Sequence, residues 1–296
     1  MTDQLRIGLV GAGPWATTVH GPGIVAHPDT DLAGVWARRP AVAAELAAAN
    51  GTKAFDSVSS LIAAVDAVAF AVPPSVQVPL AIEAANAGRH LILEKPIAST
   101  VDDAVRLADA VGAAGVASVV MLVLRFAQET RQWLAAAATT GGWQAGTARW
   151  LTGGLLGGPY HTSPWRHDEG ALADIGPHTI DLVEAALGEV TEVLAARYRE
   201  PDVWHLVLGH AGGGSSTVSM SMKLALRPSI TSVELYGANG HSVFPSRSTP
   251  AAGSYSALLD DFVGMVRGGV ASHPLDVHHG LHLQRVIGEA RALSER

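Results

Sequence analysis

Glu94, Lys95 and Pro96 come at the end of an apolar run in the stretch LILEKPIAST, residues 91–100. An acid, a base and a proline gain little from packing there, because burying a charge is costly unless it is paired. An ammonium group at such a position could instead stabilise the negative charge that develops on an alkoxide oxygen in a transition state. We therefore interpret Lys95 as a residue presented for chemistry, with Glu94 and Pro96 as its neighbours at a cofactor site.

Asp174 and His178 form a second group that could do chemistry, in the stretch GALADIGPHTID. Four residues apart on a predicted helix, they share one face. An imidazole has an ordinary pKa near ~6.5 and can exchange a proton at neutral pH, while a carboxylate can hold substrate hydroxyls or orient a network. The alternative is a helix-capping aspartate beside an interior histidine with ordinary hydrogen-bond partners.

A glycine-rich turn follows the first apolar run, in GLVGAGPWA. Gly11, Gly13 and Ala16 form a G-x-G-x-x-A pattern that follows a predicted strand, opens a predicted helix and begins a β-α-β unit. The glycines permit a tight turn and close approach to a pyrophosphate, which the helix N-terminus then binds. Pro14 and Trp15 lie inside the motif, and Pro14 removes one N–H donor. We predict a dinucleotide-binding loop; the alternative is a glycine turn that only packs.

The end of the next predicted strand reads VWARRP, and it indicates which dinucleotide to expect. A carboxylate at this place would bind a ribose 2′-hydroxyl, but the stretch has Ala37, Arg38 and Arg39 and no acid. Guanidinium groups suit a 2′-phosphate. We therefore expect NADP in preference to NAD; the alternative is two exposed surface arginines.

Val72, Pro73 and Pro74 end a further apolar run in FAVPPSVQ and would form a stiff shelf beside the cofactor. Ligands of open α/β sheets bind beyond the carboxyl ends of the strands. The glycine loop, the two arginines, this shelf and Lys95 all lie at such ends. Their common place predicts one cofactor-binding edge.

The pattern of apolar runs predicts two domains, residues 1–122 and 123–296. The first alternates strands and helices, which is typical of a parallel sheet with helices on both faces. Its expected strands cover 5–13, 31–37, 65–72, 90–95 and 116–126, and its expected helices cover 39–51, 75–88 and 99–115. The second is rich in strands, which favours a large, mainly antiparallel sheet. Its expected strands cover 144–154, 191–200, 203–226 and 230–244, with one helix over 170–188. Helical patterns over 255–269 and 278–295 follow, and we expect these C-terminal helices to pack back on the first domain.

Composition narrows the functional classes. The 296 residues are 48% hydrophobic and 16% charged, with a formal net charge of −7 and no cysteine. The negative charge argues against nucleic-acid binding, and the lack of cysteine excludes disulfides and thiolate chemistry. No apolar run approaches the ~20 residues of a membrane span, and no signal-peptide pattern is present. We expect a soluble cytoplasmic protein.

The motifs together resemble those of the Gfo/Idh/MocA oxidoreductase family, over nearly the whole chain. The resemblance rests on GLVGAGPWA, AVPPSVQ, LEKPIA, LRF and WRHDEGALADIGPHTID. It implies a Rossmann domain joined to an α+β domain with an open, mainly antiparallel sheet, and oxidation or reduction of sugars, cyclitols and related polyols with NAD or NADP. It also implies that Lys95, Asp174 and His178 are catalytic and that the Lys95–Pro96 bond is cis. The chain departs from the family pattern at Gln77, where a histidine is usual, and at Glu169-Gly170, where glycines are common.

Other polar residues are expected at the margins of the site. Arg125 ends a predicted strand at the cofactor edge, and Trp165 and Arg166 precede the helix with Asp174, so each could contact nicotinamide or substrate, with surface packing as the alternative. Four histidines near the C-terminus could suggest a metal site: His273, His278, His279 and His282. No accompanying carboxylate pattern supports one, and we expect no metal.

Two functions remain open at this point. The first is an NADP-dependent sugar or polyol oxidoreductase, and the second is a catalytically silent dinucleotide-binding sensor on the same fold. Retention of a lysine, an aspartate and a histidine suited to proton transfer favours the enzyme. The wide second sheet also predicts a homodimer or homotetramer.

Overall fold

The protein is described by a computed structural model that covers residues 4–158 and 160–295. Its internal contacts divide the chain into two units, each built from two stretches of sequence. The first unit comprises Met1–Phe126 and Pro250–Leu281, and the second comprises Ala127–Thr249 and His282–Arg296.

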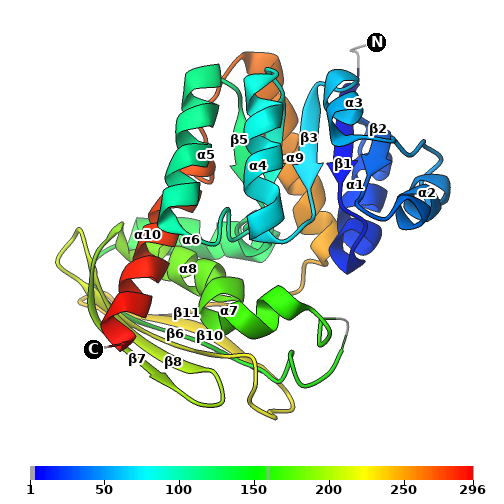
Figure 1. The fold of residues 1–296 in the computed structure, drawn as a ribbon. Coiled ribbons are helices and arrows are strands. Elements are labelled where there is room, and N and C mark those ends of the chain that lie inside the picture. Colours follow the sequence, from blue (N-terminus) through cyan, green and yellow to red (C-terminus); the bar gives the residue numbers. More distant parts are fainter. Residues whose placement is uncertain (1–3, 159, 296) are drawn as a thin grey trace. The chain divides into compact units, whose positions relative to one another are not determined.

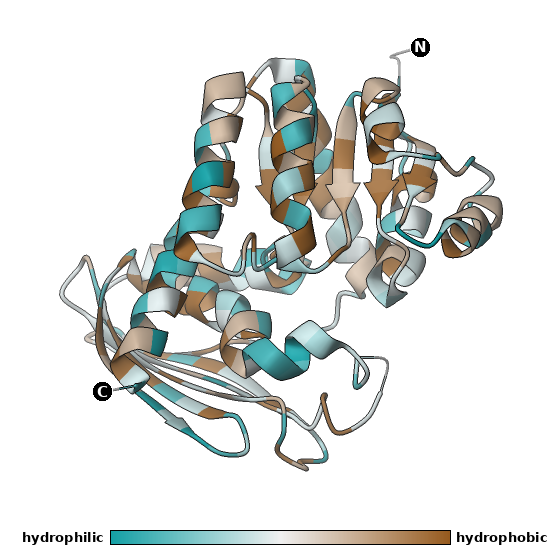
Figure 2. Ribbon diagram, in the orientation of Figure 1, coloured by the Kyte–Doolittle hydropathy of each residue, from teal (hydrophilic) through white to brown (hydrophobic). Residues whose placement is uncertain are grey.

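A parallel five-stranded sheet forms the centre of the first unit, in the order β2-β1-β3-β4-β5 (Figure 1). Its strands are β1 (Leu5–Val10), β2 (Thr30–Trp36), β3 (Ala67–Phe70), β4 (His90–Leu93) and β5 (Ser118–Val120). All four residues of β3 are buried, as expected for a parallel sheet covered on both faces, and Figure 2 shows β1 and β3 mostly in hydrophobic colours. The strand order reverses between β1 and β3, which is where ligands bind in such sheets.

Helices cover both faces of this sheet. They are α1 (Gly21–Ala26), α2 (Pro40–Ala49), α3 (Val58–Ala63), α4 (Pro74–Asn86), α5 (Val101–Ala114) and α9 (Ala251–Gly268), with the π-helical turn η1 (Ala16–His20) before α1. Helix α4 packs against α5, whereas α1 packs against α9; Figure 1 shows α4 and α5 in front of the sheet and α9 behind it. Thr100 caps the start of α5, because its Oγ1 accepts a hydrogen bond from Asp103 N at 3.1 Å.

The strand expected over 116–126 is shorter than predicted. Strand β5 ends at Val120, and the 3₁₀ turn η2 (Val123–Phe126) follows. Leu122 N donates to Val120 O at 2.7 Å, which turns the chain out of the strand, and η2 packs against α9. The apolar run itself cannot reveal that its second half packs on a helix more than 120 residues further along the chain.

A six-stranded sheet forms the second unit, in the order β11-β10-β6-β9-β8-β7. Its strands are β6 (Trp143–Leu151), β7 (Val190–Arg199), β8 (Val203–His210), β9 (Ser215–Ser221), β10 (Ile230–Gly237) and β11 (Gly240–Val243). Only β6 and β9 run parallel; the other neighbours are antiparallel. The expected fold class is confirmed, although the run 203–226 is two strands, joined by a turn in which His210 N donates to Gly214 O.

Three helices lie on one face of this sheet: α6 (Gln128–Thr140), α7 (Pro164–Asp174) and α8 (Gly176–Leu187). Helix α8 packs on β6, β9 and β10. The single helix expected over 170–188 is interrupted twice, at Gly170, whose φ of 67° is not helical, and at Ile175, which separates α7 from α8. The last helix, α10 (Val277–Ser294), begins in the first unit and ends in the second. No helix within residues 4–158 and 160–295 is long and apolar enough to span a membrane.

Candidate dinucleotide pocket and catalytic residues

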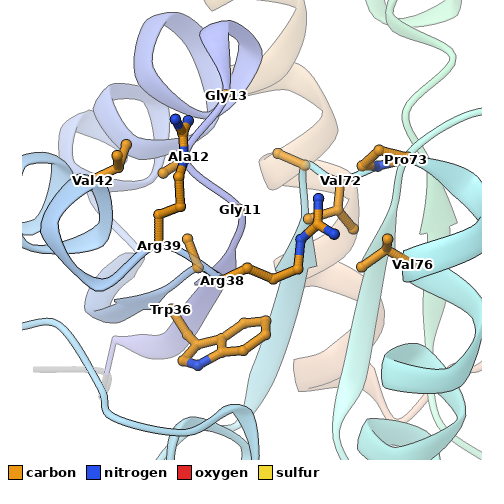
Figure 3. A pocket seen from close by; sticks show the side chains of 12 residues that line it. Gly11, Ala12, Gly13, Trp36, Arg38, Arg39, Val42, Val72, Pro73 and Val76 are labelled. Carbon is orange, nitrogen blue, oxygen red and sulfur yellow. The ribbon is translucent and has the colours of Figure 1, made fainter. Parts of the chain in front are cut away.

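A pocket of about 440 Å³ opens at the carboxyl ends of β1, β2 and β3 (Figure 3). It sits where the strand order of the first unit reverses, and its size is ordinary for a small-molecule site. Its lining consists of Gly11, Ala12, Gly13, Trp36, Ala37, Arg38, Arg39, Val42, Ala71, Val72, Pro73 and Val76.

The glycine loop forms one wall of the pocket. A side chain would not fit at Gly11. Its φ is +120°, and a Cβ there would come within 2.4 Å of Ala71 O. The N–H of Gly11 donates to Trp36 O at 2.8 Å, which joins the loop to the end of β2. A Cβ on Gly13, in contrast, would meet no atom within 4 Å. Gly11 is therefore required by the fold, whereas Gly13 lines the pocket and has open space where a side chain would be.

Two guanidinium groups provide the charge of the pocket. Arg38 and Arg39 are exposed, and neither has an acidic partner in the described part of the chain. Figure 3 shows the Arg38 side chain extending toward Val72 and Val76, while Arg39 points toward the glycine loop. The apolar side chains of Val72 and Val76 face these cations across the pocket. Such a slot suits an aromatic base joined to anionic groups.

The pocket brings together seven of the residues predicted to bind cofactor: Gly11, Gly13, Ala37, Arg38, Arg39, Val72 and Pro73. Sequence reasoning did not select five lining residues, namely Ala12, Trp36, Val42, Ala71 and Val76. Their positions beside selected motif residues were the available signal. Other predicted residues of this unit lie outside the lining: Pro14, Trp15, Ala16, Pro74, Glu94, Lys95, Pro96 and Arg125.

Lys95 lies in the turn that follows β4 in the same unit, half-buried, and the Lys95–Pro96 bond is cis as expected. Its neighbour Glu94 takes part in a buried chain of side chains. Glu94 Oε1 is 2.9 Å from His20 Nε2, and His20 Nδ1 is 3.1 Å from the hydroxyl of Tyr255. His20 and Tyr255 are fully buried. Burial, and to a lesser extent the Glu94 charge, raise the pKa of Tyr255 well above its ordinary value, so this hydroxyl stays protonated and can donate.

Asp174 and His178 lie in the second unit, at the junction of α7 and α8. The prediction of one continuous helix is corrected here: Asp174 is the last residue of α7, and His178 is in the first turn of α8. Ile175 between them keeps right-handed helical angles, and Thr179 N donates to Ile175 O at 3.1 Å. Both candidate side chains are therefore carried by one short helical junction, and both are buried.

Each of these two residues has an aromatic or cationic neighbour. Arg166 Nε donates to Asp174 Oδ2 at 2.9 Å, and the Arg166 guanidinium lies 4.5 Å from the ring centre of Trp165. The His178 ring is tilted by 30° against that of Trp150, with 5.6 Å between their centres. Arg166, predicted like Trp165 to be a cofactor neighbour, thus contacts both Asp174 and Trp165 within the second unit.

A buried carboxylate fixes the kink in α7. Asp202 is 3% exposed, and both its carboxylate oxygens accept hydrogen bonds from Ala171 N, at 3.0 and 3.1 Å. It lies so close to Gly170 that a Cβ there would come within 2.4 Å of Oδ1. Burial raises the pKa of Asp202, against the lowering effect of its backbone donors. Asp202 thereby caps the short helical segment that ends at Asp174.

The remaining candidates have ordinary surroundings. Arg125 is half-buried in η2, beside Phe126, whose ring stacks on His273. His282 Nε2 is 2.6 Å from Glu184 Oε2, and this hydrogen bond raises the pKa of His282. Among the described residues, no three His, Asp or Glu side chains are grouped to hold a metal ion.

Comparison with known families identifies both halves of the chain. Residues 5–122 match the family profile described as "Oxidoreductase family, NAD-binding Rossmann fold", and residues 134–243 match "GFO/IDH/MocA C-terminal domain". The chain belongs to the Gfo/Idh/MocA oxidoreductase family. The glycine loop, the paired arginines and Lys95 all fall within the first match.

Relatives of this chain include proteins named as sugar reductases or dehydrogenases. The rhizopine catabolism protein MocA of Rhizobium meliloti is 25% identical over 297 residues, covering 90% of this chain and 88% of that protein. The dTDP-3,4-didehydro-2,6-dideoxy-alpha-D-glucose 3-reductase of Streptomyces antibioticus is 35% identical over 101 residues, which cover 33% of this chain and 31% of that one. Among solved structures, GenD2 from gentamicin A biosynthesis, in complex with NAD, has a TM-score of 0.87 at 19% identity, covering 100% of this chain and 95% of that chain.

Proposed function

We propose that this protein is an NADP(H)-dependent oxidoreductase that transfers hydride between nicotinamide and a carbon of a sugar, cyclitol or related polyol. The observation that supports NADP is the composition of the pocket: two guanidinium groups and no carboxylate stand at the end of β2. A 2′-phosphate would gain charge-assisted hydrogen bonds there, whereas a 2′-hydroxyl would find no carboxylate acceptor in the lining.

Cofactor binding would use the first unit. The glycine loop leaves room for a pyrophosphate beside the helical run that starts at Pro14, where main-chain N–H groups favour an anion. Val72 and Pro73 would support the base and ribose, with Pro74 fixing the start of α4 behind them. Glu94, Pro96 and Arg125 would border the nicotinamide end.

Three residues would carry the chemistry. When bound, the nicotinamide supplies or accepts the hydride. His178 would exchange the proton of the substrate hydroxyl, and Lys95 would stabilise the charge that develops on that oxygen. Asp174, held by Arg166, would orient substrate hydroxyls. The proton and the hydride leave different atoms of one CH–OH group, so oxidation yields a carbonyl and the reverse step reduces it.

The substrate class rests on the relatives. Their names include a nucleotide-linked deoxysugar reductase and a rhizopine catabolism protein, which supports a polyhydroxylated substrate. Cytoplasmic location and assembly as a homodimer or homotetramer stay predictions of the sequence, as do the domain limits 1–122 and 123–296.

The test is a turnover screen preceded by a binding measurement. Calorimetric titration with NADPH and NADH should give the tighter binding for NADPH, and equal or tighter binding of NADH would refute the cofactor choice. A panel of sugars, cyclitols and oxo-sugars is then followed at 340 nm, the absorbance of reduced nicotinamide. Tight cofactor binding without turnover of any panel member would favour the alternative, a dinucleotide sensor without catalysis.

A further inference from the structure

Gln77 is a fully buried side chain at the start of α4 whose amide group reaches the turn that carries Lys95. Its Oε1 accepts a hydrogen bond from Glu94 N at 2.8 Å, and its Nε2 donates to Glu94 O at 2.9 Å and to Ile97 O at 3.1 Å. Both amide hydrogens and the carbonyl oxygen are thus used. The residues bound, 94 and 97, flank the cis Lys95–Pro96 bond on both sides.

The side chain of Glu94 is held separately. His20, fully buried in η1, lies 2.9 Å from the Glu94 carboxylate through Nε2, and Tyr255 of α9 lies 3.1 Å from its other ring nitrogen. A carboxylate only accepts hydrogen bonds, so Nε2 carries the donated hydrogen and Nδ1 accepts from the Tyr255 hydroxyl. Glu94 is therefore fixed through its main chain by Gln77 and through its side chain by His20.

We propose that Gln77 and His20 are positioning residues for Lys95. The proposal rests on the catalytic role proposed above for Lys95, and it assigns to two buried polar side chains the task of fixing where that ammonium points. Neither contacts cofactor or substrate in this account; each acts only through the main chain or the neighbouring side chain of Lys95.

The use of polar groups here supports positioning over packing. An apolar side chain of similar volume would fill the space of Gln77, but would leave one N–H and two carbonyl groups without these partners, and unsatisfied buried polar groups are costly. The same turn of α4 also carries Val76, which lines the dinucleotide pocket. One helical turn thus sets both a pocket wall and the lysine turn, so the distance from bound cofactor to Lys95 depends on Gln77.

The lysine content of the chain makes a direct test possible. Only Lys53, Lys95 and Lys223 are present, so reductive methylation with ¹³C-formaldehyde gives three lysine signals besides that of the N-terminus, and Lys95→Arg assigns one of them. The spectrum is recorded for the wild type and for Gln77→Met, Gln77→His and Tyr255→Phe. Gln284→Met, which alters a buried glutamine of the second unit, is the control for general loss of stability.

We expect the Lys95 signal to move most in Gln77→Met, less in Gln77→His and Tyr255→Phe, and not in Gln284→Met, while the Lys53 and Lys223 signals stay in place. Gln77→His keeps one donor and one acceptor and is the variant to use if Gln77→Met does not fold. A Lys95 signal unchanged in the folded Gln77 variants would overturn the proposal for Gln77, and an unchanged signal in Tyr255→Phe would overturn it for His20.

Kinetics separate this proposal from the proposed function. With a substrate from the screen, Gln77→Met should lower kcat by up to ~10²-fold, the scale for misplacing a reacting group by about 1 Å, and leave the Kd for NADPH within about two-fold. A displaced Lys95 signal with wild-type kcat would contradict catalysis by Lys95 and leave the positioning itself supported. Loss of kcat in Lys95→Met, with an undisplaced Lys95 signal in Gln77→Met, would support catalysis by Lys95 and contradict its positioning by Gln77.

Discussion

Arg166 Nε donates to Asp174 Oδ2 at 2.9 Å, and the two side chains are only 20% and 7% exposed. The pair spans α7, which is kinked between them at Gly170. Because Asp174 is buried, this guanidinium offsets part of the cost of burying its charge.

Changing Arg166 to Met should therefore remove one charge-assisted hydrogen bond from a buried carboxylate. We expect a loss of about 2–3 kcal/mol in the free energy of unfolding, below the range for fully buried pairs because Arg166 keeps some contact with water. Urea unfolding of Arg166→Met, Asp174→Asn and the double variant measures the coupling. If the pair matters, the double variant loses less than the sum; strict additivity would contradict the coupling.

Substituting alanine for each of the two loop glycines should have different effects on stability and on cofactor binding. Gly11→Ala places a methyl group 2.4 Å from Ala71 O at a φ of +120°, so thermal unfolding should occur at a clearly lower temperature. Gly13→Ala meets no protein atom and should keep the wild-type Tm, but its methyl group enters the space proposed for the pyrophosphate. NADPH affinity should then fall at unchanged stability, and an unaltered Kd in Gly13→Ala would argue against a pyrophosphate there.

Arg38→Ala and Arg39→Ala test the 2′-phosphate. Loss of a charge-assisted hydrogen bond corresponds to about 10–100-fold in the Kd for NADPH, with little change for NADH. If one arginine dominates, we expect it to be Arg38, which lies nearer the end of β2. The calorimetric titrations use both dinucleotides with every variant, and parallel losses for NADPH and NADH would show that the arginines do not read the 2′-phosphate.

Lys95→Met keeps most of the side-chain volume and removes the charge. Turnover should fall by ~10²–10³ if the ammonium stabilises the developing oxyanion, and His178→Ala should cost ~10²–10⁴ through loss of proton transfer. If both groups act on one oxygen, as proposed, the double variant should lose less than the product of the two. Near-normal turnover of a folded Lys95→Met protein would show that the lysine is structural.

Stability should fall as the pH rises above neutrality, through His282. The hydrogen bond with Glu184 raises the pKa of His282 above the ordinary 6.5. The folded protein therefore binds this proton more tightly than the unfolded chain does. This contribution is complete below pH 6.5 and is lost as the pH passes through the raised value. Urea midpoints between pH 6 and 9 should decline less in His282→Gln than in the wild type. His205→Gln, on an exposed histidine of β8, is the control and should keep the wild-type slope.

The parts of the fold and site that the sequence revealed depend on local signals. Gly11 and Gly13 predict a loop, and the backbone conformation at position 11 is one that favours glycine. Arg38 stands where a carboxylate would otherwise be expected. The capping of α5 by Thr100 likewise involves residues three apart. Each of these features depends on residues that are close together in the sequence.

The parts that the sequence concealed depend on partners distant along the chain. Gln77 looked like a departure from a family pattern, and its three hydrogen bonds go to residues 17 and 20 positions away. The turn that follows β5 packs on α9, and the kink at Gly170 is held by Asp202. Periodicity cannot register such contacts, since it reports only which face of an element is apolar.

Residues that complete the first unit are synthesised long after its parallel sheet. Ser118 Oγ accepts from Val277 N at 3.1 Å, Val120 N donates to Leu275 O, and the Tyr255 hydroxyl contacts His20. A ribosome adding 5–20 residues per second needs about 8–30 s to travel from the end of the first stretch to the end of the second. During that interval the nascent parallel sheet has an unpaired apolar edge at β5, the kind of edge on which chains aggregate. The stretch 127–249 is synthesised meanwhile, so the nascent first unit waits, incomplete, until most of the second has emerged.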